Sequence, residues 1–202
     1  MIPNPLSLVE DHTLPVVLTA LGGIAWMAAE YYGRWSTWKQ GAVRRPPSTL
    51  DRGTYPAIAL SLAIGMGSTV LAFLSGFGGL FPEWVSPFGL LVVGVGLGIR
   101  VWALRTLGRF FTMPITLRAD HEIVRAGPYR WIRHPAYTGG FLTAIGMTLA
   151  LGPPVGLAVT VVACLIAYVH RIRVEEATLV SRFGDDYRRY SETTWRLLPP
   201  VY

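Results

Sequence analysis

The sequence predicts an all-α integral membrane protein with about five transmembrane helices, a polar cytoplasmic segment and amphipathic helices at the C-terminus. Two observations lead to this prediction. Hydrophobic residues make up 51% of the 202 residues and charged residues only 15%, whereas soluble domains carry about 25% charged residues. The apolar residues also gather in five runs, and all 18 basic residues fall on one predicted side of the membrane.

The first half of the chain predicts three spans. Residues 14–32 form an apolar run with Glu30 near its end, close to the ~20 residues that cross ~30 Å of hydrocarbon. Residues 55–81 form a second run without charge, and residues 88–104 form a third. Arg100 lies near the end of the third run, so we expect its side chain to extend toward water.

Small residues predict close contacts between these spans. Ser61 and Gly65 are four residues apart, as are Gly94 and Gly98, and such pairs allow membrane helices to approach closely. The glycines of the third run lack the strand and the polar context of a dinucleotide-binding motif. Helix packing is therefore the interpretation that we favour for them.

The last two spans are predicted to form a helical hairpin. Residues 136–151 and 155–169 are short for a crossing, and Gly152-Pro153-Pro154 separates them. Proline is disfavoured inside a helix and is common in turns. Both helices can borrow flanking residues to complete a crossing.

The chain after the hairpin predicts amphipathic helices. Residues 171–182 continue the last span as an amphipathic helix, which we expect to end at Phe183-Gly184. Asp185 is expected to cap a short last helix with Tyr187 and Tyr190 on one face.

The distribution of basic residues predicts the orientation. Segments 33–54, 100–135 and 170–202 hold 5, 7 and 6 basic residues, which together are all of them. The positive-inside rule then places the N-terminus outside and the C-terminus in the cytoplasm. This topology, with anionic lipid headgroups, accounts for the net charge of +6 without a nucleic-acid partner. Only Lys39 is a lysine, and this bias toward arginine points to a bacterial inner membrane.

The most polar stretch of the chain predicts a binding site. His121, Tyr129, Arg133, His134 and Tyr137 lie within 17 residues. Pro135 ends any helix before it and places His134 and Tyr137 on a bend where the chain re-enters the membrane. Irregular backbone at such a point lines a cavity or is covered by protein.

The chemistry of these residues suits one cofactor. Arg130 and Arg133 can bind a carboxylate, and the aromatic rings can face a cation. Glu175 and Glu176 can accept hydrogen bonds from ribose hydroxyls or an ammonium group. An anion site, a cation cage and hydroxyl acceptors together suit S-adenosylmethionine. No His, Cys and carboxylate set has metal-ligand spacing, so we expect no metal.

Plainer interpretations also exist. Tyr and Trp at membrane boundaries are ordinary belt residues, and Arg at the end of a span is ordinary topology. Arg171 and Glu175 are four residues apart and could form a simple ion pair on a helix.

The polar motifs resemble one known family. The chain contains His121-x-x-Val124, Gly127-Pro-Tyr129, Arg133-His134-Pro135-x-Tyr137-x-Gly139, Arg171-x-x-x-Glu175-Glu176 and Phe183-Gly184-x-x-Tyr187. Together these motifs resemble the isoprenylcysteine carboxyl methyltransferase family of integral membrane methyltransferases, over roughly residues 105–200. On this basis we divide the chain into a three-span membrane region, residues 1–104, and a methyltransferase-like core, residues 105–202.

The resemblance implies roles for individual residues. S-adenosylmethionine would be held in a cytoplasmic cofactor-binding segment and by Glu175, and Arg171 would face the acceptor. To the cofactor residues implied by the family we add Arg133 for its charge, and the full set is His121, Glu122, Ile123, Val124, Tyr129, Arg133, His134, Pro135, Ala136, Tyr137 and Glu175.

The expected acceptor is lipophilic and enters sideways from the membrane lipids. A carboxylate acceptor would need only Arg171 to orient it. A thiol or phenol would also lose a proton, for which His134 or Glu176 is the expected base, and an amine is a further possibility. Two rival hypotheses are an NADPH-dependent membrane reductase of the sterol-reductase type, which would use Arg130, Arg133 and Arg171 for the phosphates, and a non-catalytic membrane module.

Overall fold

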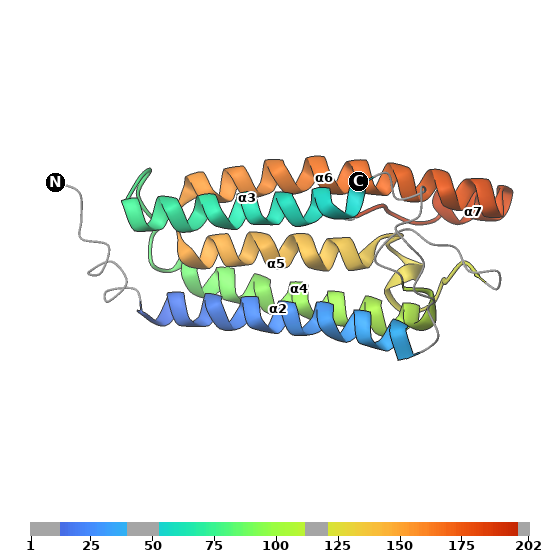
Figure 1. The fold of residues 1–202 in the computed structure, drawn as a ribbon, viewed down its shortest axis with the longest axis horizontal. Coiled ribbons are helices and arrows are strands. Elements are labelled where there is room, and N and C mark those ends of the chain that lie inside the picture. The colour runs from blue at the N-terminus through green and yellow to red at the C-terminus, as the bar shows by residue number, and fades with distance from the viewer. Residues whose placement is uncertain (1–12, 40–52, 112–120, 198–202) are drawn as a thin grey trace.

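A computed structural model describes residues 13–39, 53–111 and 121–197. Residues 40–52, which belong to the first predicted cytoplasmic segment, and the end of the C-terminal tail lie outside this part. Long helices run side by side along the molecule, and short elements gather at one end (Figure 1). The long helices are α2 (Thr13–Lys39), α3 (Thr54–Ser75), α4 (Val85–Leu107), α5 (Pro135–Leu151) and α6 (Pro154–Phe183). The short elements are η1 (Gly108–Phe110), η2 (Gly127–Arg130) and α7 (Asp185–Glu192).

The predicted all-α membrane fold is confirmed. The helices α2, α3, α4 and α6 are long and apolar enough to cross a membrane. The fourth predicted span, residues 136–151, corresponds to α5, which has 17 residues and lies between the other helices with most of its residues buried. Within the described ranges, four helices therefore meet the length of a full crossing, and α5 is an inner helix of the bundle.

Two helix ends differ from the predicted ones. The second run was expected to continue to residue 81, but α3 ends at Ser75 because Gly76 adopts a left-handed conformation with φ of 67°. In contrast, α6 continues without a break from the last span through the amphipathic segment to Phe183, as predicted. Asp185 does not cap α7, because Gly184 occupies the N-cap position, and its carboxylate instead accepts a bond from Arg188 at 2.8 Å.

The helical hairpin is present. Gly152 has φ of 101°, which favours glycine, and Pro154 begins α6 at a position where a helix needs no N–H donor. The two helices of the hairpin nevertheless find their main neighbours elsewhere, since α5 packs mostly on α4 and α6 packs mostly on α3.

The prediction that Gly94 and Gly98 pack against another helix is wrong. A Cβ atom at either position would meet nothing within 4 Å, whereas a Cβ on Gly96 would lie 2.8 Å from the carbonyl oxygen of Gly139 on α5. The prediction for Ser61 and Gly65 is confirmed. Ser61 is buried, and a Cβ on Gly65 would lie 3.0 Å from the Cα of Thr160 on α6.

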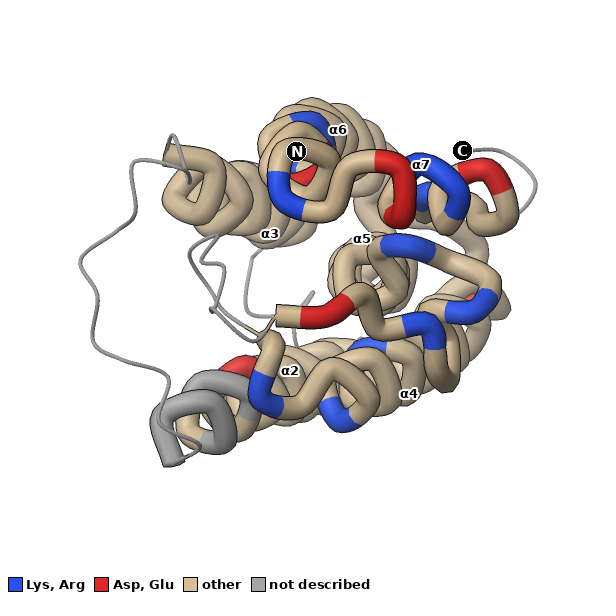
Figure 2. The backbone as a smooth tube through the Cα atoms, turned by 90° about the vertical axis from the view of Figure 1, so that its right-hand side faces the viewer, with Lys and Arg blue, Asp and Glu red and all other residues tan. Residues whose placement is uncertain are grey.

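Arg100 also differs from its prediction. Its side chain does not extend to water but is buried, because two acceptors from other helices meet it inside the bundle. Its Nη1 donates to the carbonyl of Ala136 at 2.7 Å, and its Nη2 lies 2.5 Å from the carboxylate of Glu30. In contrast to Arg100, the charged residues of the short elements lie at one end of the molecule, which faces the viewer in Figure 2.

Candidate functional site

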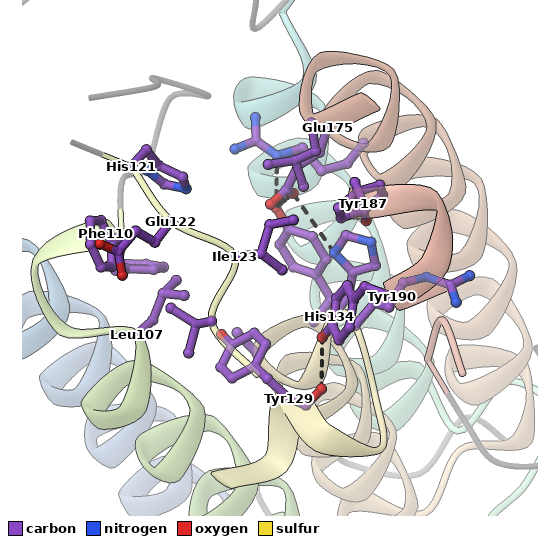
Figure 3. A pocket seen from close by; sticks show the side chains of 17 residues that line it. Leu107, Phe110, His121, Glu122, Ile123, Tyr129, His134, Glu175, Tyr187 and Tyr190 are labelled. Carbon is purple, nitrogen blue, oxygen red and sulfur yellow. Dashed lines mark hydrogen bonds and ion pairs between the residues drawn. The ribbon is translucent and has the colours of Figure 1, made fainter. Parts of the chain in front are cut away.

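A pocket lies at the end of the bundle where the short elements gather. Its walls come from the end of α4, η1, the extended stretch before η2, the start of α5, the outer part of α6, and α7. Side chains from these walls face one another across the pocket (Figure 3). The lining residues are Leu107, Phe110, Phe111, His121, Glu122, Ile123, Val124, Tyr129, Arg133, His134, Ala136, Tyr137, Arg171, Glu175, Leu179, Tyr187 and Tyr190.

The structure brings together most of the residues predicted for the site. All of the predicted cofactor residues except Pro135 line this pocket, and so do Arg171 and His134. Pro135 starts α5 instead, and Glu176 lies behind the wall, where it contacts Arg133 and His134. The roles of these residues in binding or catalysis stay predictions.

The bend before α5 positions two of the side chains. His134 has φ of −122° and ψ of 53°, outside the helical region, and its carbonyl accepts the first bonds of α5, from the N–H groups of Tyr137 and Thr138. The imidazole is buried and stacks on the ring of Tyr137, with ring centroids 5.5 Å apart. The predicted bend therefore fixes both rings on one wall of the pocket.

A chain of hydrogen bonds crosses the floor of the pocket. Arg171 donates from Nη1 to the hydroxyl of Thr54 at 2.7 Å and from Nε to the hydroxyl of Tyr137 at 2.9 Å. The Tyr137 hydroxyl in turn donates to the carboxylate of Glu175 at 2.6 Å. Arg171 and Glu175 are thus coupled through Tyr137, which joins α3, α5 and α6 at this point.

A second network fixes the wall behind His134. The carboxylate of Glu176 accepts bonds from Arg133 at 2.9 Å and from Arg196 at 3.1 Å, and it lies 3.4 Å from the His134 ring. Arg133 also donates to the carbonyls of Ser191 and Thr194. Its guanidinium is therefore already engaged inside the protein.

The other arginine of the predicted anion site lies elsewhere. Arg130 stacks on the ring of Trp131, 3.6 Å from its centroid, and it does not line the pocket. The two arginines therefore do not form a common carboxylate clamp in this arrangement.

The C-terminal segment closes over the bend. The backbone N–H of Arg133 donates to the carbonyl of Trp195 at 2.7 Å, and that of His134 donates to the carbonyl of Arg196 at 3.1 Å. The hydroxyl of Thr138 donates to the carbonyl of Leu197 at 2.7 Å. These bonds hold the start of α5 against the end of the described chain.

Aromatic residues of α7 and η1 also line the pocket, and no site role was predicted for them. Tyr187 and Tyr190 point inward from α7, and Tyr190 donates to the carbonyl of Tyr129 at 2.7 Å. The hydroxyl of Tyr187 is buried and has no hydrogen-bond partner in the described ranges. In the sequence, the placement of Tyr187 and Tyr190 on one helix face could have indicated that they line the pocket, whereas no local pattern indicated this for Phe110.

These tyrosines are neutral at physiological pH. Burial raises the pKa of Tyr190 to about 12, although the nearby Arg133 and Arg125 act in the opposite direction. Burial, reinforced by the negative charge of Glu175, raises the pKa of Tyr129 well above its usual value. Burial, followed by the charges of Glu176 and Glu175, does the same to the pKa of Tyr187. The pocket therefore presents phenol groups as hydrogen-bond donors rather than as anions.

Two further cavities continue from the pocket toward the middle of the bundle. The first shares Phe111, Tyr137 and Arg171 with the pocket. The second, of about 450 Å³, is lined by apolar residues of α2, α3 and α5 and shares Trp26 and Leu62 with the first. The two cavities thus lie in a row between the polar pocket and the space between α2 and α3, and we call this row the path; its outer part is mostly apolar, whereas Glu30, Arg100 and Arg171 line the part next to the pocket.

These features define a class of protein, a multi-pass helical membrane protein with a polar pocket at one end of the bundle. The family model described as the isoprenylcysteine carboxyl methyltransferase family matches residues 89–181. The chain belongs to this family of membrane methyltransferases.

Individual relatives agree with this assignment. Protein-S-isoprenylcysteine O-methyltransferase B of Arabidopsis thaliana is 32% identical over 141 residues, which cover 67% of this chain and 72% of the relative. The A form from the same plant is 36% identical over 129 residues, covering 60% of this chain and 66% of the relative. The enzyme of the same name from Tribolium castaneum is 33% identical, covering 58% of this chain and only 42% of the relative. The matches thus span about two fifths to three quarters of these relatives.

A solved structure shares the fold. The structure of a eukaryotic intramembrane Ras methyltransferase ICMT superposes with a TM-score of 0.60 at 22% identity. The superposition covers 98% of this chain and 68% of that chain.

Proposed function

We propose that this protein transfers a methyl group from S-adenosylmethionine to a lipophilic acceptor at the membrane interface. The observation that carries the proposal is the position of a polar pocket next to the path that begins between α2 and α3, with Tyr137 and Arg171 at the junction where the two share lining residues. The names of the relatives, which are O-methyltransferases, support the same reaction class. An acceptor with an apolar tail fits the path, and its reactive head would lie at the junction.

The pocket fits the proposed cofactor. S-adenosylmethionine combines an adenine ring, ribose hydroxyls, an amino-acid group and a sulfonium. The carboxylate of Glu175 can accept from hydroxyl or ammonium groups, and the rings of Tyr129, Tyr137 and Phe110 supply flat apolar surface and can face a cation. The buried Tyr187 hydroxyl, without a partner in the described ranges, is available as a donor. Residues 121–124 would complete the wall around the cofactor.

The residues at the junction would act mainly by positioning. When bound, the cofactor supplies an electrophilic methyl group, and alignment of the two reactants can account for much of the rate enhancement. Arg171 and Glu175 hold the hydroxyl of Tyr137 from two sides, which fixes the wall between the pocket and the path. Arg171 would orient the acceptor, and His134, which contacts Glu176, would serve as a base where the acceptor carries a proton.

The proposal includes an orientation. Figure 2 shows Lys and Arg at the end of the molecule where the short elements gather, and the pocket lies at this end. This end would face the cytoplasm of a bacterium, because positive residues are retained on that side of the inner membrane. In this arrangement the water-soluble cofactor reaches the pocket directly. The functional division into residues 1–104 and 105–202 stays a prediction.

The arrangement of arginines does not favour the NADPH-dependent reductase. That function would need a group of free basic side chains for the phosphates. Arg133 is engaged with Glu176 and two carbonyls, and Arg130 lies outside the pocket on Trp131. Arg171 is buried and bonded to Thr54 and Tyr137.

The test of the proposal is calorimetry with S-adenosylhomocysteine, the product form of the cofactor. We expect the purified protein to bind it at micromolar concentration, and Glu175→Ala to abolish binding because the carboxylate at the pocket wall is lost. Glu192→Ala removes an exposed carboxylate at the end of α7 and is the matched control. Absence of heat with the wild-type protein would contradict the methyltransferase proposal, and NADPH titrated in the same way tests the alternative.

A further inference from the structure

Tyr168 on α6 has a hydroxyl group that the surrounding protein does not bond. The side chain is only 3% exposed, and its ring packs against the rings of Tyr137 and Phe141. Its hydroxyl makes no hydrogen bond in the described part of the chain. An unpaired buried hydroxyl costs free energy, and phenylalanine would fill nearly the same space without that cost. The hydroxyl is therefore a donor that a ligand can use.

Tyr168 lines the inner cavity, by which we mean the part of the path that shares lining residues with the pocket. Arg171, three residues further along α6, lines both the inner cavity and the pocket, whereas Tyr168 lines only the former of these two. Residues three apart lie on one face of a helix. A head group that comes along the path toward the pocket would therefore meet Tyr168 before it reaches Arg171.

Gly140 on α5 provides the space for the hydroxyl. A Cβ atom at this position would lie 2.8 Å from the hydroxyl oxygen of Tyr168, 3.9 Å from the ring carbon Cζ and 3.8 Å from Nη1 of Arg100. Only the contact with the hydroxyl is shorter than an ordinary van der Waals contact. The absence of a side chain at Gly140 thus accommodates the hydroxyl rather than the ring, and it places the hydroxyl near Arg100, which lines the same cavity.

The polar groups of the inner cavity are mainly hydrogen-bond donors. Its charged lining residues in the described ranges are Glu30, Arg100 and Arg171. Guanidinium groups donate and do not accept. The carboxylate of Glu30 is already engaged, since it lies 2.5 Å from Nη2 of Arg100 and accepts from the indole of Trp26 at 3.1 Å. A head group with accepting oxygens suits this lining better than one that only donates.

We propose that Tyr168 binds the acceptor, with its hydroxyl donating a hydrogen bond to an oxygen of the head group beside Arg171. This inference rests on the proposed function and adds a residue to its acceptor site. The bond would be present both before and during methyl transfer, because the hydroxyl holds the head group and exchanges no proton with it. An interaction that is equally strong in both states affects KM and leaves kcat unchanged.

The experiment uses N-acetyl-S-farnesylcysteine, a probe with an apolar tail and accepting carboxylate oxygens. Its Kd is measured by calorimetry, and its KM by transfer from labelled S-adenosylmethionine. Tyr168→Phe should raise both constants about tenfold or more, the usual loss for one hydrogen bond to a charged group, without a change in kcat or in the binding of S-adenosylhomocysteine. Its unfolding temperature should equal or exceed that of the wild type, because the unpaired hydroxyl does not stabilise the fold. Tyr31→Phe, on an exposed part of α2, is the matched control.

A second variant tests the hydroxyl through its neighbour on α5. Gly140→Ala should also raise the Kd for the probe, because the added Cβ displaces the hydroxyl of Tyr168. When Gly140→Ala is combined with Tyr168→Phe, no further rise is expected, since the nearest remaining atoms lie 3.8 and 3.9 Å away. Two residues that act through one atom are not additive. Additive effects would show that Gly140→Ala acts through helix packing, and they would overturn the role of the hydroxyl.

The remaining outcomes separate this inference from the proposed function. A wild-type protein that binds no S-adenosylhomocysteine contradicts the proposed function. If the wild type binds it, three results overturn the role of Tyr168 alone. These are a wild type that does not bind the probe, an unchanged Kd for the probe in Tyr168→Phe, and a lower unfolding temperature of this variant together with weaker binding of S-adenosylhomocysteine.

Discussion

At the scale of single residues, Glu176 holds the wall of the pocket together. Its carboxylate binds Arg133 and Arg196 and contacts His134, and the side chains of Glu176 and Arg133 are 13% and 9% exposed. Replacement by alanine would leave Arg133 largely buried without its anion.

We therefore predict that Glu176→Ala lowers the free energy of unfolding in detergent by about 3–5 kcal/mol, the usual cost of removing one partner from a buried ion pair. The matched control is Asp185→Ala, which breaks an exposed pair with Arg188 and should change stability by less than about 1 kcal/mol. Thermal unfolding of the two purified variants measures the difference. Equal stability would show that Glu176 is not a structural anchor.

The sequence identified many of the pocket residues but not their partners. His134 and Tyr137 were predicted because the proline bend before α5 is a local feature, and Glu175 was predicted because the resemblance to the family implied it. The bond between Arg133 and Glu176 joins residues 43 positions apart, and a local pattern does not specify such a contact. The same reason explains Arg100, since its place near the end of an apolar run indicated exposure, whereas the docking of α2 brings Glu30 to it.

At the scale of helices, the contact between α4 and α5 depends on glycines that allow the two backbones to touch. A Cβ on Gly96 would lie 2.8 Å from the Gly139 carbonyl, and one on Gly146 would lie 2.7 Å from the Gly89 carbonyl. Because backbone atoms of a packed helix cannot move independently, an added methyl group forces the helices apart.

We predict that Gly96→Ala destabilises the protein by about 1–3 kcal/mol, as overpacking usually does. Gly94→Ala is the control two residues away on the same helix, where the added Cβ meets nothing within 4 Å. It should be neutral or stabilising by up to about 1 kcal/mol, because alanine favours the helix over glycine. The two unfolding temperatures, measured in one detergent, test this, and the reverse order would contradict the packing of α4 on α5.

The wrong glycine prediction has a physical cause. The spacing of four between Gly94 and Gly98 defines a helix face, but Gly96 offers another face of the same helix. Which face is buried is decided by the position of α5, and periodicity within α4 contains no information about it. By contrast, glycine and proline in the turn at 152–154 act through the backbone alone, and there the sequence predicted the hairpin correctly.

At the scale of the whole molecule, the fold combines an apolar surface suited to lipid with a polar pocket suited to a water-soluble ligand. Apolar side chains cover the outside of the long helices, where Leu71 is 70% and Ile166 is 68% exposed. The polar pocket lies among the short elements, which gather at one end of the molecule (Figure 1). The helical character of the long elements followed from the apolar runs because each run must satisfy its backbone internally in lipid. The pairing of α4 with α5 and of α3 with α6 could not be derived in this way, because lipid-facing and helix-facing surfaces are both apolar.

The orientation can be tested with the single cysteine of the chain. Cys164 is buried in α6, so a Cys164→Ala background is expected to fold and to carry no thiol. In this background we place one cysteine at Glu83, in the turn before α4, or at Arg188 on α7, both of which are exposed and lie at opposite ends of the bundle. A membrane-impermeant maleimide should label the cysteine at position 83 when applied to the outside of spheroplasts. The cysteine at position 188 should be labelled only after the inner membrane is opened, because the proposed orientation places the arginine-rich end in the cytoplasm. The opposite labelling pattern would reverse the orientation, and it would place the pocket proposed for the cofactor on the side of the membrane where S-adenosylmethionine is not made.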